Sequence, residues 1–289
     1  MSDQASTNTP PLVSVCIPVY NGEKTIAETV ASVLQQSYPN VEIIIQDNQS
    51  TDGTWSLLNS FAKNNPQISL EQNQKNLGMA ANWNVAINRA KGEYIMLLSA
   101  DDLLEPLFLK RCIDILKNKQ VDAASTNHFY LQEGRKWKRK MRLKKGIYAY
   151  FPEVILFYNP FSVNFTLFSK QIINQIKVRG NLFARSLLTC DYDLEIRFSL
   201  SGAKIHYLAD DFLGAYRIHA LNLSRQHITR MPRQTALVVF AHKKELKRHC
   251  MFTYRFTLLR FFLRGIRELI LSRPFDKRLS SVLLREILN

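Results

Sequence analysis

Several acidic side chains stand directly after short apolar runs, where they could hold a metal ion or move a proton. Asp101 and Asp102 follow the run 94–98, and Asp47 follows the run 41–45. Two adjacent carboxylates repel each other unless they are solvated or neutralised, and a divalent cation with oxygen ligands neutralises them well. Taken alone, the acidic pair also fits a solvated loop, and the residues after Asp47 also fit ordinary turn chemistry.

Further candidates lie after the first apolar run and in the second half of the chain. Residues 18–23 follow the run 13–17 and form a polar loop. Asp191 opens a predicted helix, where an acidic residue is usually a cap. His219 is a lone histidine, which is more often a packed or surface residue than a ligand. Neither of the usual phosphate-cradling loops, GxGxxG and GxxxxGKS/T, follows a predicted strand, so a bound nucleotide would be held in another way.

The elements that must position these residues are predicted from hydrophobic spacing. The runs 13–17, 41–45 and 94–98 have the length and composition of buried strands, and the apolar residues between them recur at helical spacing. Strands that alternate with helices of about 10–15 residues indicate βαβ units. The predicted fold class is α/β, with a mainly parallel central sheet flanked by helices. Ligands bind beyond the carboxyl ends of such strands, so the three polar segments are expected to meet there.

Six segments stand in a fixed order along the chain: Val-Ser-Val-Cys-Ile-Pro-Val-Tyr-Asn from Val13, Asp-Asn-Gln-Ser-Thr-Asp-Gly-Thr from Asp47, Asn-Leu-Gly-Met-Ala-Ala-Asn-Trp-Asn from Asn76, Lys-Gly-Glu-Tyr-Ile-Met-Leu-Leu-Ser-Ala-Asp-Asp from Lys91, Asp-Tyr-Asp-Leu from Asp191, and Tyr-Arg-Ile-His from Tyr216. In this order and spacing they resemble glycosyltransferase family 2, whose catalytic domain has the GT-A fold. The resemblance covers roughly residues 12–225. It implies an inverting transferase that takes its sugar from a nucleotide-diphospho-sugar.

For the nucleotide, the resemblance implies roles for residues in the first two segments. Pro18, Tyr20 and Glu23 correspond to residues that line the nucleotide pocket. Asp47 corresponds to the carboxylate that hydrogen-bonds the base. The family commonly has Asp and Gly after that carboxylate, and this chain instead has Asn48 and Gln49, which could alter contacts with the base or ribose.

For the metal, the resemblance points to the acidic pair. Asp101 and Asp102 correspond to the Asp-x-Asp-type motif, in which the final carboxylate, here Asp102, binds the Mn²⁺ or Mg²⁺ that bridges the donor diphosphate. His219 lies where some members supply a further metal or diphosphate ligand. Ser99 stands where many members have another Asp. A cation with oxygen ligands would offset the charge that develops on a nucleoside diphosphate leaving group.

For the acceptor, the resemblance assigns the general base to Asp191. An acceptor hydroxyl must lose its proton as it attacks the anomeric carbon from the face opposite the leaving group, and a carboxylate can take that proton. One direct displacement inverts the anomeric configuration. Cys190 stands where an acidic residue usually precedes the base, so Asp193 remains the alternative.

The net charge of +15 is concentrated in one loop and in the C-terminal region. Residues 134–145 contain eight Lys/Arg and no acidic residue, and residues 231–289 contain thirteen Lys/Arg against four Asp/Glu. Such local charge indicates an anionic partner: phospholipid, nucleic acid or an acidic substrate. Residues 252–271 also have the pattern of an amphipathic helix rich in Phe and Leu, which suits an interfacial helix. We expect this region to bind an anionic membrane surface. The alternative is that it packs on the sheet with its arginines in solvent.

These patterns predict a flexible tail at 1–11, a catalytic domain at 12–225 and a basic, amphipathic helical region at 226–289. No apolar run reaches the ~20 residues of a spanning helix, and the start has no signal-peptide pattern. Four cysteines that are far apart and form no CxxC pair indicate free thiols in a reducing compartment. The protein is therefore expected in the cytoplasm, peripheral on the inner face of the cell membrane.

The predicted function is transfer of a sugar to a glycan or lipid-linked acceptor during assembly of a bacterial surface polysaccharide. A sugar-nucleotide pyrophosphorylase is disfavoured because residues 18–24 lack the glycine-rich, arginine-bearing loop of those enzymes. A nucleic-acid-binding protein would explain Trp137 inside the basic loop, but the near-neutral body contains no reader motif, so we expect no nucleic-acid partner. A non-catalytic member of the family is the remaining alternative.

Overall fold

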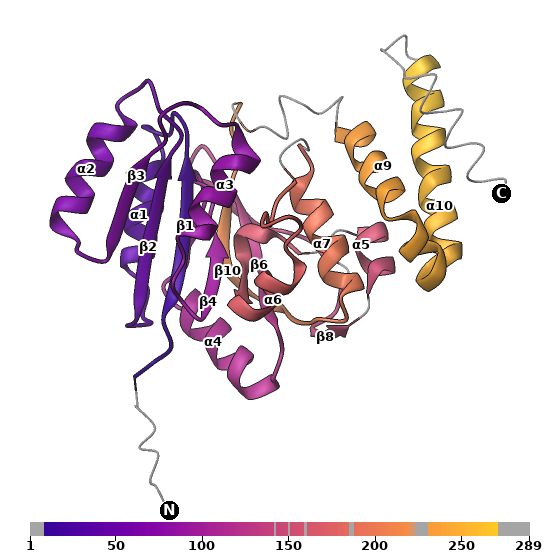
Figure 1. The fold of residues 1–289 in the computed structure, drawn as a ribbon, viewed down its shortest axis with the longest axis horizontal. Helices are drawn as coiled ribbons and strands as arrows, with labels where there is room; N and C mark the ends of the chain where they lie inside the picture. Colours follow the sequence, from indigo (N-terminus) through magenta and orange to yellow (C-terminus); the bar gives the residue numbers. More distant parts are fainter. Residues whose placement is uncertain are drawn as a thin grey trace, which may run out of the picture.

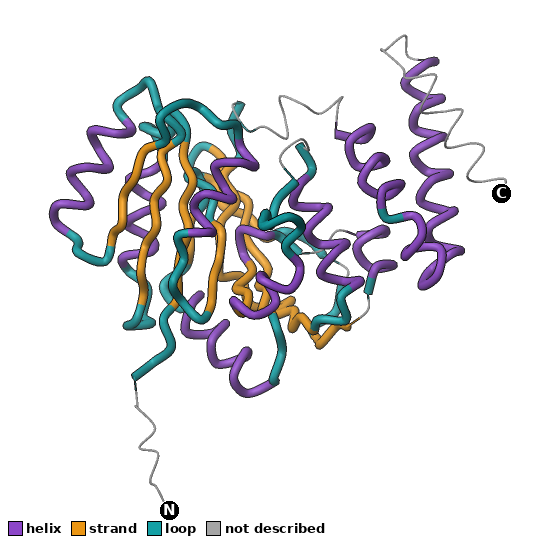
Figure 2. Tube along the Cα trace, viewed as in Figure 1, coloured by secondary structure: helices purple, strands orange, loops and turns teal. Residues whose placement is uncertain are grey.

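A computed structural model describes residues 9–141, 143–149, 151–158, 161–184, 188–220, 222 and 231–270. In these residues, helices cover both faces of one sheet (Figures 1 and 2). The strand order is β3-β2-β1-β4-β9-β6-β10-β5, with β7 on β6 and β8 on β10. The predicted flexible tail is described only from residue 9 onward.

The N-terminal part of the sheet is parallel, as the sequence predicts. Strand β1 pairs in parallel with β2 and β4, and β2 pairs in parallel with β3. All seven residues of β1 are buried, because helices cover both of its faces. The elements are β1 (Val13–Val19), α1 (Ile26–Leu34), β2 (Val41–Asp47), α2 (Thr54–Asn64), β3 (Ile68–Gln72), α3 (Met79–Asn88) and β4 (Tyr94–Leu97).

The second half of the sheet is mixed. Strands β6 (Ala123–Gln132) and β10 (Lys204–Arg217) pair in parallel, but β9 (Thr166–Ser169) lies antiparallel between β4 and β6. The short strands are also antiparallel to their partners: β5 (Leu103–Leu104), β7 (Arg135–Lys138) and β8 (Gly146–Ala149). The α/β class is therefore confirmed, whereas parallel pairing is limited to β1–β4 and the β6–β10 pair. Strands this short carry too little periodicity to be found in the sequence.

Side chains that alternate along the strands enter two cores, one on each face of the sheet. In β1, Cys16 enters one core, and Val15 and Ile17 enter the other. The Cys16 core is built with α3, α5 (Pro152–Tyr158), α6 (Lys170–Ile176) and α7 (Cys190–Leu200), and the other with α1, α2 and α4 (Phe108–Lys119). A short 3-10 helix, Val163–Phe165, leads into β9. The four cysteines are free and buried, as predicted.

The C-terminal helices α9 (Met231–Ala241) and α10 (Lys243–Ile270) are docked on the body, beside α5 and α7 (Figure 1). Leu246, Tyr254 and Leu258 are fully buried in the core that also contains Ile155 of α5. This face of α10 therefore packs against the body of the protein and is not available to a membrane. The predicted boundary at residues 225 and 226 and the segment 271–289 lie outside the described residues. Among the described helices, none combines the length and apolarity that crossing a membrane requires.

A buried ionic cluster joins the C-terminal helices to α7. The Asp193 carboxylate accepts hydrogen bonds from His242 Nε2 at 2.8 Å and from Arg197 Nε at 2.9 Å. Arg197 also donates to the carbonyl oxygen of Leu182 at 2.5 Å. Burial by itself raises the pKa of Asp193, but the hydrogen bonds and charges of His242 and Arg197 outweigh it and lower that pKa below the ordinary value. The cluster therefore holds Asp193 ionised.

Asp193→Asn is expected to lower the free energy of unfolding by about 1–3 kcal/mol, because the amide has one acceptor oxygen where His242 and Arg197 bond two. The pKa of Asp193 is lower in the folded chain, so its contribution is present above the unfolded pKa and is lost as the pH falls through the folded pKa. Thermal unfolding at pH 7 and below about pH 4 checks this. The difference in Tm between the two proteins should shrink in acid, and an equal difference at both pH values would contradict the assignment.

Candidate functional site

The carboxyl ends of β1, β2 and β4 bring the three predicted polar segments to one edge of the sheet. The Glu23 carboxylate, after β1, accepts a hydrogen bond from the Gly53 amide, after β2, at 3.1 Å. The Thr25 hydroxyl donates to the Ala100 carbonyl, after β4, at 3.0 Å. The segments therefore form one continuous surface, as parallel strands of this order require.

The residues predicted to line the nucleotide pocket differ in exposure. Tyr20 is 48% exposed and Glu23 is exposed, whereas Pro18 and Asp47 are buried in β1 and at the end of β2. The Asp47 carboxylate accepts a hydrogen bond from Gln72 Nε2 at 2.7 Å. Asp47 is thus held in one orientation beneath the loop that follows it.

A network of asparagines, which the sequence analysis did not predict, fixes the loop after β2. Asn48 is buried, and its Oδ1 accepts from Asn73 Nδ2 and from the Leu77 amide, each at 2.9 Å. This departure from the family pattern therefore joins the loop to the segment before α3. Gln49, the second departure, has a positive φ of 60°, a conformation that glycine adopts without strain.

Asp101 and His219 meet on the accessible side of the acidic loop. Asp101 Oδ2 lies 2.8 Å from His219 Nε2 and accepts from Asn222 Nδ2 at 3.2 Å. The His219 amide donates to Asn222 Oδ1 at 2.7 Å, so Asn222 orients both groups. The Asp101 and His219 side chains are 25% and 32% exposed. A carboxylate oxygen and an imidazole nitrogen therefore converge where a ligand can reach them.

Asp102 points the other way, into the protein. It is fully buried, Oδ1 accepts from the Arg217 amide at 2.9 Å, and Oδ2 accepts from Asn164 Nδ2 at 2.7 Å. Burial, and then the neighbouring charge of Asp101, raise the pKa of Asp102 despite these two hydrogen bonds. The family resemblance implies a metal held by Asp102 and His219; the structure brings Asp101 to His219 instead.

The Asp101–His219 pair suits a divalent cation in part. Carboxylate oxygen and imidazole nitrogen are both ligands of Mn²⁺ and related ions. Within the described ranges, no group of three or more His, Cys, Asp or Glu side chains could enclose a metal. A cation at this pair would need its other ligands from water or from a bound phosphate. The donor set thus fits a metal that is shared with a substrate.

Next to this loop lies a cleft of about 340 Å³, within the size range of small-ligand sites. Asn164 connects the acidic loop with the cleft, because it donates a hydrogen bond to Asp102 and also lines the cleft. The walls combine aromatic and polar side chains: Trp83, His128, Tyr130, Arg139, Phe161, Ser162, Val163, Asn164, Asp191, Glu195 and Tyr216. Flat aromatic faces with a few polar groups suit a sugar ring.

Asp191 lies in the first turn of α7 and lines the cleft, whereas Asp193 does not. Asp191 Oδ1 accepts from the Tyr192 amide at 2.8 Å. Burial raises the pKa of Asp191, and the hydrogen bond from the Tyr192 amide offsets part of this effect. Both oxygens of Asp193 are occupied by His242 and Arg197. Of the two carboxylates, Asp191 is the one placed to accept a proton from a ligand.

Residues of the site that were not predicted include Asn164, Arg217, Glu195 and Asn222. Asn164 lies in a charge-free, mostly apolar stretch, and Glu195 follows Asp191 by four residues, which places both on one face of a helix. Those two signals were available in the sequence. The role of Arg217 was not, because its contact with Asp102 is made by the backbone amide.

Comparison with known proteins identifies the family of the chain. The model of the family described as Glycosyl transferase family 2 matches residues 14–176, more than half of the chain. The chain is 35% identical over 127 residues to hyaluronan synthase of Pasteurella multocida, covering 44% of this chain and 13% of that protein. It spans about half the length of other curated relatives that it matches.

Solved structures share the fold. S. aureus TarS 1–349 in complex with UDP has a TM-score of 0.64 at 20% identity, covering 95% of this chain and 86% of that chain. Mannosyltransferase PcManGT from Pyrobaculum calidifontis, in complex with GDP-Man and Mn²⁺, has a TM-score of 0.63 at 18% identity, covering 96% and 80%. These likenesses confirm the expected sheet-and-helix architecture. The family itself is shown by the match over residues 14–176: the chain belongs to glycosyl transferase family 2.

Proposed function

We propose that the protein is an inverting glycosyltransferase that moves a sugar from a nucleotide-diphospho-sugar to a hydroxyl of a glycan or lipid-linked acceptor. The observation that carries this proposal is that Asn164 lies between two candidate binding sites, because it contacts the acidic loop and also lines the cleft. One is the accessible Asp101–His219 pair, and the other is the cleft with Asp191 in its wall. A donor diphosphate at the first and an acceptor at the second would place leaving group and nucleophile side by side.

On the donor side, the nucleotide lies over the surface formed by the loops after β1 and β2, with Tyr20 and Glu23 accessible and Asp47 held beneath. Asp101 and His219 would hold Mn²⁺ or Mg²⁺, with Asp102 as the buried support of the loop. The cation, when bound, supplies charge that stabilises the nucleoside diphosphate as it leaves. The Mn²⁺ of the PcManGT complex supports this choice of metal for a related fold.

On the acceptor side, Asp191 takes the proton of the attacking hydroxyl. The oxygen of that hydroxyl bonds to the anomeric carbon as the bond from this carbon to the diphosphate oxygen breaks. The electron pair of the broken bond leaves with the nucleoside diphosphate, and the proton stays on the Asp191 carboxylate. One displacement from the opposite face inverts the anomeric configuration. The partly buried setting of Asp191 suits a base, because its raised pKa brings it closer to neutral pH.

A panel of UDP- and GDP-sugars, scored for Mn²⁺-dependent hydrolysis and for thermal stabilisation of the protein, tests the proposed function. At least one donor should be hydrolysed only with metal present and should raise Tm. No hydrolysis and no stabilisation across the panel would favour a non-catalytic family member. The polysaccharide-synthesising relative supports an acceptor in a bacterial surface glycan, such as a growing chain or its lipid-linked precursor.

We infer that α10 also attaches the protein to the inner face of the cell membrane. The face of α10 opposite its buried side exposes Phe252 (80%), Phe256 (41%), Leu259 (37%) and Leu263 (53%). Their spacing of four, three and four residues places them on one stripe of the helix. The sequence of α10 contains eight Lys/Arg against two Glu. An apolar stripe within a basic helix suits the headgroup region of an anionic bilayer, where each Lys/Arg contributes about 1 kcal/mol.

Flotation with vesicles of phosphatidylcholine, with and without phosphatidylglycerol, measures this attachment. The wild-type protein should float with the anionic vesicles and be released by salt. Replacing Phe252 and Leu263 together by Ser should weaken binding at least about tenfold, because two large side chains no longer enter the interface. The matched control is Leu107→Ser, since Leu107 is 56% exposed but lies next to α4. Equal flotation of all three proteins would exclude α10 as the attachment surface.

A further inference from the structure

A second carboxyl group, that of Glu195, lies in the wall of the cleft that contains Asp191. Glu195 is on α7, one helical turn after Asp191, so the two side chains share a face of the helix. It is 9% exposed, and its Oε2 is buried with no hydrogen-bond partner among the described residues. A buried polar atom without a partner is uncommon in folded proteins and requires an explanation.

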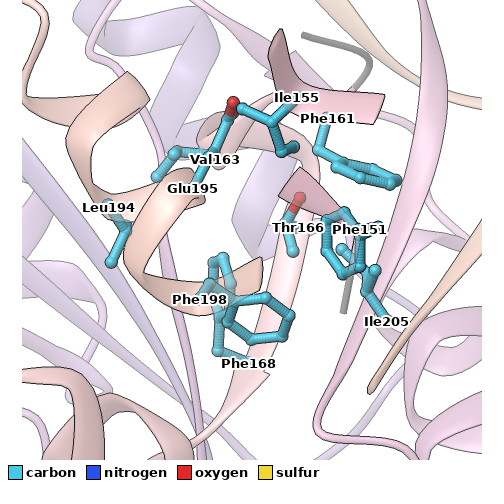
Figure 3. A pocket seen from close by; sticks show the side chains of 10 residues that line it. All are labelled: Phe151, Ile155, Phe161, Val163, Thr166, Phe168, Leu194, Glu195, Phe198 and Ile205. Carbon is cyan, nitrogen blue, oxygen red and sulfur yellow. The ribbon is translucent and has the colours of Figure 1, made fainter. Parts of the chain in front are cut away.

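On the inner side of Glu195, the part of the chain that the structure describes provides no hydrogen-bond partner for Oε2. There the side chain borders a small cavity of about 20 Å³, whose other lining residues are apolar except for Thr166 (Figure 3). Such a volume holds about one water molecule at most, and apart from Glu195 and Thr166 its lining side chains offer that water no hydrogen-bond partner. On its other side, Glu195 borders the cleft. The cleft is therefore the side from which a ligand can approach the Glu195 carboxyl group.

The charges around Glu195 favour its neutral form. Burial, and then the charge of Asp191, raise the pKa of Glu195 well above its ordinary value, and Arg139 opposes this only in part. His128, which lines the same cleft, adds no positive charge, because burial lowers its pKa to about 3. A neutral carboxyl group can both donate and accept a hydrogen bond, as a sugar hydroxyl can.

We propose that Glu195 is a specificity-determining residue, whose carboxyl group hydrogen-bonds an acceptor-sugar hydroxyl adjacent to the one that Asp191 deprotonates. This inference rests on the proposed transfer to a hydroxyl. Two carboxyl groups one helical turn apart on the same helix face can reach neighbouring hydroxyls of a single ring. The aromatic wall, with Trp83 and Tyr216, would contact the apolar faces of that ring. The enzyme would thus select an acceptor ring by a pair of adjacent hydroxyls.

The test compares Glu195→Ala and Glu195→Gln with the wild-type enzyme. The acceptors are methyl hexopyranosides and their single-deoxy analogues, used with the nucleotide sugar that the wild-type enzyme hydrolyses fastest. Glu195→Ala should raise the acceptor KM by about 10- to 100-fold, the effect of one hydrogen bond to a buried polar group, without changing the KM of the donor. Glu195→Gln should stay near wild type, because an amide imitates the neutral acid in both donating and accepting.

The deoxy analogues separate a direct contact from a structural effect. For the wild-type enzyme, one deoxy analogue should have a higher KM than its parent glycoside. For Glu195→Ala, the KM values of this analogue and its parent should be equal. If Glu195→Ala keeps the wild-type acceptor KM, or still distinguishes that analogue from its parent, the proposal is wrong.

If the wild-type enzyme hydrolyses a donor but transfers to no glycoside, the same comparison is made by saturation-transfer NMR of the glycosides with the enzyme bound to the nucleoside diphosphate. Glu195→Ala should then lose the signal that the wild-type enzyme gives. A signal equal to that of the wild type, or none from either protein, would refute the contact. Absence of donor hydrolysis in the wild type would instead refute the proposed function.

Discussion

Replacing Asp191 by Asn should lower the rate of sugar transfer by about 10²- to 10⁴-fold while leaving the affinity for the nucleotide sugar unchanged. The amide fills the same space in the first turn of α7 and can still accept from the Tyr192 amide, but it cannot take a proton. Single-turnover transfer and isothermal titration with the donor measure the two quantities separately. A variant that transfers at the wild-type rate would remove Asp191 as the base.

The pH dependence of the wild-type enzyme gives an independent check. Only the ionised carboxylate accepts a proton, so kcat/KM for transfer should fall as the pH drops through the pKa of Asp191. Because burial raises that pKa, the acidic limb should lie above the ordinary value of about 3.9. An acidic limb at or below the ordinary value would contradict the assignment.

Asp193→Asn is the matched control, since it makes the same chemical change two residues along the same helix. Asp193 is bonded to His242 and Arg197 and does not line the cleft. The expected result is a lower Tm with transfer close to wild type at temperatures where the variant is folded. If Asp193→Asn is inactive and Asp191→Asn is active, the two roles are exchanged.

The second large effect is expected at the acidic loop. Asp101→Asn should reduce metal-dependent activity by about 10²- to 10³-fold, because it removes the charged oxygen beside His219 that would bind the cation. Its Tm without metal and donor should stay close to wild type, since the side chain is partly exposed. Activity and donor affinity measured against Mn²⁺ concentration give the result. Wild-type Mn²⁺ dependence in this variant would exclude Asp101 as a ligand.

The neighbouring substitution should behave differently. Asp102→Ala leaves the Arg217 amide and Asn164 Nδ2 buried without their acceptor, which should lower the free energy of unfolding by about 1–3 kcal/mol for each unpaired group. Activity should fall as well, because the loop that presents Asp101 loses its support. A variant with wild-type stability that lacks only metal binding would return the ligand role to Asp102, as the family resemblance implies.

The sequence predicted much of the framework. The runs 13–17, 41–45 and 94–98 correspond to β1, β2 and β4, as predicted. The polar segments that follow them lie at one edge of the sheet. These features are predictable because a strand that is buried on both faces needs a nearly continuous apolar run, and parallel pairing then fixes where the loops meet. The antiparallel strands of the second half were not predicted, since their pairing depends on distant partners.

The choice between neighbouring carboxylates was also beyond the sequence. Asp102 turns inward because Asn164 and the Arg217 amide, 62 and 115 residues away, donate to it. Asp193 is withdrawn from the cleft because His242, 49 residues away, bonds it. Residue type and local spacing are the same for both members of each pair. Only long-range donors distinguish the member that faces the ligand from the member that supports the fold.

The four buried cysteines can report on unfolding of the unmodified protein, because each thiol is accessible to reagents only when the structure around it opens. Burial raises the pKa of every one of these thiols, to about 11 for Cys250 and further for the others, so a thiol reagent can modify them only after the surrounding structure opens. Each thiol marks a different element: Cys250 lies in α10, Cys190 in α7 and Cys16 in β1, all in one core, and Cys112 lies in α4 in the core on the opposite face. Pulsed alkylation followed by mass spectrometry would therefore record, without any substitution, the order in which the C-terminal helices, the helix of the proposed base and the two cores come apart.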